Sequence, residues 1–108
     1  MILTMWSKIK YFFQRGLRGY ADCDLWAIDY WLATVMVKAL AQFNRERYGY
    51  PHDMGDEEWG KIIDTMREGF EATLKLDDTY DDKEYKKVKA IQDKGLALFA
   101  KYFNYLWD

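Results

Sequence analysis

The feature that most constrains this chain is a helical repeat of apolar residues across residues 22–48. Successive residues of a helix lie about 100° apart, so side chains three or four positions apart share one side. The apolar side of this stretch consists of Leu25, Ile28, Leu32, Met36, Ala39, Leu40 and Phe43. The polar side consists of Thr34, Lys38, Gln42 and Arg45. The pattern predicts a single long helix, and it places Asp29 in the middle of the apolar side.

Asp29 is the residue that breaks this pattern. A carboxylate on an apolar face costs free energy unless it is hydrogen-bonded or paired. In one interpretation Asp29 belongs to an internal network and accepts from a Trp indole, a Tyr hydroxyl or an arginine of residues 15–19. In the other it contacts a ligand, for example by accepting from the amino group of a nucleobase. The sequence leaves both interpretations open.

Three more stretches repeat apolar residues at helical spacing, and the connections between them are short. Short connections favour antiparallel neighbours. The expected helices cover residues 2–15, 22–48, 56–75 and 84–107. We therefore predict an all-α fold, a compact four-helix domain over residues 1–108 with a long central second helix. Gly69 lies at the edge of the third apolar stripe, which predicts close approach of another helix there.

The aromatic content predicts association between copies of the chain. Five Trp, nine Tyr and six Phe make up 19% of its 108 residues, more than one small core can hide. Residues 96–107 are apolar nearly all round, which is typical of a central helix or a subunit contact. We expect a homo-oligomer formed through aromatic helix surfaces. The lone Cys23 excludes an internal disulfide and fits a reducing cytoplasm.

Several classes of function are disfavoured by what the sequence lacks. A net charge of −2 gives no global field toward nucleic acid, so no DNA or RNA duplex is expected as a partner. There is no phosphate-binding loop, nucleophile elbow or metal-spaced set, which predicts no enzyme, cofactor or metal site. No apolar run approaches the roughly 18 residues that cross a bilayer. A membrane partner is not expected, although residues 2–15 would suit an in-plane helix.

A mixture of arginines and aromatic residues at the junction of the first two expected helices suggests a binding site. Arginine forks bind phosphate and aromatic faces stack on bases, a combination that suits a small nucleotide better than a duplex. The candidate ligand-binding residues here are Arg15, Arg18, Tyr20, Trp26 and Tyr30. Asp29 joins them as a possible acceptor. Lys101, within the aromatic tail, could bind an anion, or its aliphatic chain could simply lie over the neighbouring rings.

Three segments together resemble a family of small phage and prophage proteins. They are DLWAIDYWLA (24–33), GYPHDMGDEEWGKIIDTMREGFE (49–71) and GLALFAKYFNYLWD (95–108). The family patterns are D-x-W-x-L-D-x-x-L-A, then G-x-P followed by E-E-W-x-x-I-L-D-x-M-I-x-x-F-E, then G-L-x-L-F-x-K-Y-F-x-x-L-W. The chain departs from them with Ile28 and Ile63 in place of Leu, and with Arg67 in place of an apolar residue. The charged Arg67 argues against burial of that helix face.

The resemblance includes the phage anti-CBASS sponges, oligomeric proteins that sequester cyclic dinucleotide signals of bacterial immunity. It implies a binder without catalysis in the cytoplasm of the infected bacterial host. The leading hypothesis is therefore an immune-evasion sponge, with Arg15 and Arg18 on the phosphates and Trp26 or Tyr30 against a base. The alternative is a small phage protein that inhibits a host or defence protein by direct contact. A third reading is a membrane-surface protein anchored by residues 2–15.

Overall fold

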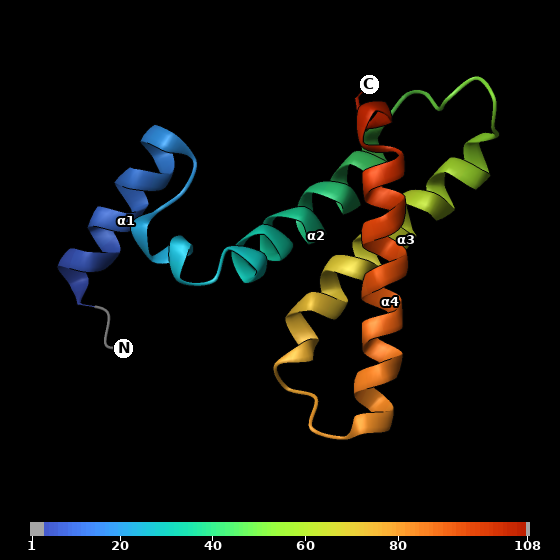
Figure 1. Ribbon diagram of the computed structural model, residues 1–108. Helices are drawn as coiled ribbons and strands as arrows, with labels where there is room; N and C mark the ends of the chain where they lie inside the picture. Colours follow the sequence, from blue (N-terminus) through green and yellow to red (C-terminus); the bar gives the residue numbers. More distant parts are fainter. Residues whose placement is uncertain (1–3, 108) are drawn as a thin grey trace. The chain divides into compact units, whose positions relative to one another are not determined.

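A computed structural model describes residues 4–107, which form four α-helices and no strand (Figure 1). The elements are α1 (Met5–Arg18), the 3₁₀ turn η1 (Asp22–Trp26), α2 (Ile28–Glu46), α3 (Asp56–Leu76), α4 (Asp82–Lys101) and the 3₁₀ turn η2 (Phe103–Tyr105). The predicted all-α class with four helices is confirmed. The predicted start of the first helix at residue 2 lies outside the described residues.

The chain divides into two compact units, residues 1–31 and residues 32–108. The boundary falls inside the first turns of α2, so the start of α2 belongs to the first unit and the rest to the second. The first unit contains α1 and η1, and the second contains α3 and α4. The assignment of residues 1–108 to a single domain stays a prediction.

The prediction of a single long helix over residues 22–48 is wrong. Residues 22–26 form η1, and Ala27 leaves the helical region with φ −152° and ψ 81° before α2 begins. The cause is Asp24, whose carboxylate accepts from the backbone N–H of Ala21 at 2.7 Å and closes a 3₁₀ turn. The resulting α2 has 19 residues, fewer than the 21 of α3, so a long central second helix is not confirmed.

The core of the second unit is built mainly on α3. Its largest fully buried side chains are Trp59, Ile63 and Met66, which recur at spacings of three and four along one face of α3. Each such side chain contributes roughly 1.5–3 kcal/mol by leaving water. Other buried members of the cluster are Ala33, Leu40 and Phe70. Arg67 is only 25% exposed and forms an ion pair with Glu71, so its face of α3 is partly covered.

The backbones of α3 and α4 approach each other closely at Gly69 and Gly95. A Cβ atom at Gly95 would lie 2.5 Å from Gly69 Cα and 2.6 Å from the carbonyl oxygen of Thr65. Gln92 Nε2 donates to Thr73 Oγ1 at 2.9 Å beside this crossing. The close approach predicted for Gly69 is thus confirmed, and Figure 1 shows the two helices side by side.

Candidate functional site

A reversal of the chain after α1 brings η1 against that helix. Gly19 follows α1 with φ 86°, a left-handed conformation that residues with a Cβ rarely adopt. Its N–H donates to the carbonyl of Arg15 at 2.9 Å, which completes the helix end. The turn returns the chain along the polar side of α1. We call this cluster, Gln14, Arg15, Arg18, Tyr20, Asp22 and Asp24, the arginine corner.

Arg15 and Asp24 form a two-pronged ion pair in the arginine corner. Arg15 Nε donates to Asp24 Oδ2 at 3.0 Å, and Nη2 donates to Oδ1 at 2.7 Å. Asp24 is 8% exposed, whereas the Arg15 side chain is 50% exposed. The hydrogen bond from Arg15 lowers the pKa of Asp24; burial opposes this shift, and the N–H of Ala21 reinforces it. The buried carboxylate is therefore charged and paired.

Arg18 is held in a similar way by Asp22 and Tyr20. Its Nη2 donates to Asp22 Oδ1, its Nε donates to the carbonyl of Tyr20 at 2.9 Å, and its guanidinium lies 4.5 Å from the centre of the Tyr20 ring. Gln14 exchanges two hydrogen bonds of 2.8 Å with Asp22. The hydrogen bond from Arg18, followed by that from Gln14, lowers the pKa of Asp22. Both arginines thus have carboxylate partners within their own unit.

Asp29 is not buried, because the apolar side on which the sequence places it is exposed at this end of α2. Its side chain is exposed and accepts from the N–H of Tyr30 at 2.8 Å. Asp29 is in the first turn of α2, one turn before the buried Ala33, where its carboxylate reaches solvent. Negative charge is favourable at this end of a helix. The first-turn position gives Asp29 a structural role, and its contact with a ligand stays a prediction.

The aromatic members predicted for the site lie in the first unit and are partly exposed. Tyr20, Trp26 and Tyr30 are 37%, 56% and 51% exposed. Trp26 packs edge-on against Tyr11, with ring centres 6.3 Å apart. Lys101 belongs to the second unit, at the end of α4, with its ammonium 5.2 Å from the centre of the Tyr102 ring. Among the predicted residues, Arg18 contacts Tyr20, and Asp29 accepts from the N–H of Tyr30.

Sequence reasoning missed the two carboxylates that complete the arginine corner. The helical repeat gives neither Asp22 nor Asp24 a role in the site, because their partners lie in α1. The available signal was charge order: α1 carries four basic residues and no acid, and two aspartates follow the turn at once. A segment of one charge followed closely by the opposite charge favours internal pairing.

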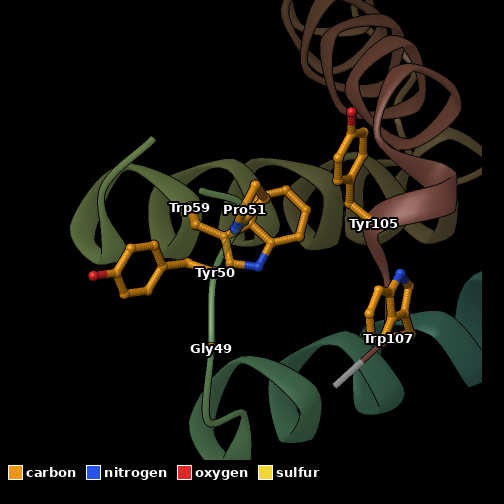
Figure 2. A pocket seen from close by; sticks show the side chains of 6 residues that line it. All are labelled: Gly49, Tyr50, Pro51, Trp59, Tyr105 and Trp107. Carbon is orange, nitrogen blue, oxygen red and sulfur yellow. The ribbon is translucent and has the colours of Figure 1, made fainter. Parts of the chain in front are cut away.

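A second candidate site is an aromatic pocket in the second unit (Figure 2). It has a volume of about 210 Å³ and is lined by Gly49, Tyr50, Pro51, Trp59, Tyr105 and Trp107. Trp59 is 1% exposed and forms part of the core, whereas Trp107 is 76% exposed. Figure 2 shows Tyr105 and Trp107 reaching the pocket from the C-terminal segment. The lining offers flat apolar surface and no charged side chain.

No known protein family, curated protein or solved structure matches this chain. Among the described residues, no group of three or more His, Cys, Asp and Glu side chains could hold a metal ion. No helix within residues 4–107 has the length and apolar character needed to cross a membrane. Fold and sites together define an all-α protein with an ion-paired arginine corner and a small aromatic pocket.

The arginine corner should loosen in acid. Because folding lowers the pKa of Asp22 and Asp24, their stabilisation is complete above the ordinary Asp value near 3.9 and is lost as the pH falls through the lower folded values. We expect the Ala21 amide, which donates to Asp24, to lose protection from hydrogen exchange below about pH 4. Exchange rates corrected for the intrinsic pH dependence test this. Asp24→Asn should remove the transition, and full protection at pH 2 would contradict it.

Proposed function

We propose that this chain is a non-catalytic binding protein that docks through the apolar face of α1. That face consists of Met5, Trp6, Ile9, Phe12, Phe13 and Leu17, whose exposed fractions run from 41% to 87%. Exposed apolar patches of this kind are typical of interaction sites. Docking needs no catalytic group, which agrees with the absence of recognisable enzyme motifs from the sequence.

The observation that supports this proposal is which side of α1 makes the internal contacts. Gln14, Arg15 and Arg18 bind η1 and the turn before it, and Tyr11 packs against Trp26. At 100° per residue these side chains lie opposite the apolar face. An amphipathic helix ordinarily buries its apolar face and exposes its polar face. In its own unit, α1 uses its polar face for packing, and the apolar face remains for another surface.

Site-specific photo-cross-linking in cells that make the protein tests the docking proposal. A photoreactive phenylalanine analogue replaces Phe12, which is 72% exposed, or Tyr80, which is 91% exposed and serves as the matched control. We expect a covalent adduct from position 12 and little from position 80, because only the first position lies on the docking face. Equal yields at both positions, or an adduct from position 12 to its own chain, would contradict the proposal.

A cyclic-nucleotide sponge is the second candidate. It is favoured by the Arg18 guanidinium stacked on Tyr20, close in the chain to the half-exposed Trp26 and Tyr30. Such a group could hold a phosphate beside a stacked base. It is disfavoured by Asp22, because a phosphate must compete with that carboxylate for Arg18. For this reason we place the sponge behind docking through α1.

Thermal melting with a panel of cyclic dinucleotides tests the sponge. A ligand that binds only the folded protein raises its transition temperature by mass action. If the arginine corner is the site, Arg18→Ala should abolish the rise, because it removes the stacked guanidinium. Arg45→Ala, an exposed arginine of α2, is the matched control and should keep it. The absence of a shift with every nucleotide would exclude this function.

A further inference from the structure

We infer that the surface on which α1 docks is an anionic lipid membrane, with the helix lying in the plane of the headgroups. The inference rests on the proposed docking through the apolar face of α1 and names its partner. Two properties of α1 support it: the segregation of positive charge into this helix, and the place of its lysines relative to the apolar face.

The charge of the chain is divided unevenly. All four charged residues of α1, Lys8, Lys10, Arg15 and Arg18, are basic. The rest of the chain carries the other 12 basic residues and all 18 acidic residues. Anionic lipid headgroups attract basic segments that lie at the membrane surface and repel acidic ones. The distribution would therefore orient the protein with α1 toward the membrane.

The lysines of α1 border its apolar face. Helical geometry places Lys10 at one edge, beside Leu17, and Lys8 at the other edge, beside Phe12. Lysines at such edges can extend their charged ends to the headgroups while their stems cover apolar surface. Lys10 is also 3.7 Å from Asp22, and its side chain remains 52% exposed. Because both arginines are paired internally and Lys10 forms an ion pair with Asp22, Lys8 carries most of the attraction.

The length and aromatic residues of α1 fit an in-plane position. Its 14 residues span about 21 Å, less than the hydrocarbon core of a bilayer. Trp6, Phe12 and Phe13 supply rings of the kind found at the boundary of headgroups and acyl chains. An amphipathic helix with this composition binds at the interface without crossing it.

A second copy of the chain is a weaker partner for the same face. In a symmetric pair the same patch of each copy meets itself, so the lysine edges of the two α1 helices would lie together. Repulsion between these like charges opposes that arrangement. An anionic membrane has no such conflict, because its charge is opposite to that of the lysines.

Vesicle flotation with the full-length protein tests the inference. We expect the protein to float with vesicles of phosphatidylcholine and phosphatidylglycerol, and several-fold less with phosphatidylcholine alone. Binding should fall in 1 M salt, where the screening length drops from about 8 Å to about 3 Å. Lys8→Glu should reduce flotation several-fold, whereas Lys87→Glu, the same change at an exposed position of α4, should not. Phe12→Asp should abolish it with helical circular dichroism retained.

Three results would overturn the inference. They are no flotation with anionic vesicles, equal flotation with both vesicle types, and unchanged flotation of Phe12→Asp. The cross-linking at position 12 separates this failure from failure of the docking proposal. An adduct to a protein or to a second copy, without flotation, overturns only the membrane partner. No adduct at position 12 and no flotation overturn both.

Discussion

Gly95→Ala should lower the stability of the second unit by about 2 kcal/mol. The added methyl group would lie 2.5 Å from Gly69 Cα and 2.8 Å from Gly69 N, so α3 and α4 must move apart. Overpacking of this kind costs about 1–3 kcal/mol, and backbone contacts place this case at the upper end. Alanine returns roughly 1 kcal/mol through its higher helix propensity. The expected fall in transition temperature is roughly 10 °C.

Gly60→Ala is the matched control for the crossing. Gly60 is also within α3, but the nearest atom to its added methyl would be Arg47 Nη2 at 3.2 Å, the end of a flexible side chain. The Arg47 guanidinium must shift by a few tenths of an ångström against its hydrogen bonds, and the roughly 1 kcal/mol of helix propensity gained by alanine offsets that cost, so the net change in stability should be small. Thermal unfolding followed by far-ultraviolet circular dichroism measures both variants. Equal transition temperatures for the two would show that the Gly69–Gly95 approach does not hold the helices together.

The fold was most predictable where a local pattern suffices. The expected third helix, residues 56–75, agrees closely with α3 because one apolar stripe runs through it. The role of Gly69 followed from its place at the edge of that stripe. The fourth helix was expected to reach residue 107, but α4 ends at Lys101 and η2 follows. The apolar content of the C-terminal end does not indicate this change from α-helix to 3₁₀ turn.

The break before α2 was not predictable from periodicity. Residues 22–48 keep a helical repeat throughout, yet Asp24 pairs with Arg15, nine positions earlier, and closes a 3₁₀ turn instead. This pair depends on the left-handed turn at Gly19, which brings the two side chains together. A tertiary interaction thus overrides local propensity. Once the helix begins at Ile28, Asp29 becomes a first-turn residue and no longer a buried anomaly.

The ion pairing of the candidate site could not be predicted from the sequence. Its arginines and aromatic rings lie in one unit because they are close in the chain. Their availability to a ligand depends on Asp22 and Asp24, whose partners only the folded chain reveals. The amphipathic character of α1 was also visible from the sequence. Only the structure shows which of its two faces packs within the first unit, and the proposed docking depends on that result.

Trp59→Ala should cause the largest loss of stability, about 3–5 kcal/mol. Trp59 is 1% exposed and its ring packs edge-on against Tyr102, with ring centres 5.7 Å apart, so truncation leaves a cavity between α3 and the end of α4. A loss of this size is a large part of the 5–15 kcal/mol typical of a folded domain. Denaturant unfolding followed by circular dichroism measures it without relying on the tryptophan removed.

Trp107→Ala is the matched control, because Trp107 lines the same aromatic pocket but is 76% exposed. Its removal should change stability by about 0.5 kcal/mol, as for most surface substitutions. Equal losses for the two variants would mean that the C-terminal segment, and not the α3 core, holds this end of the second unit. If Trp59→Ala loses more stability than Trp107→Ala, the main role of Trp59 is in the core of the second unit. Ligand binding to the pocket should then be tested with Trp107→Ala, because Trp59→Ala could lose binding simply by unfolding.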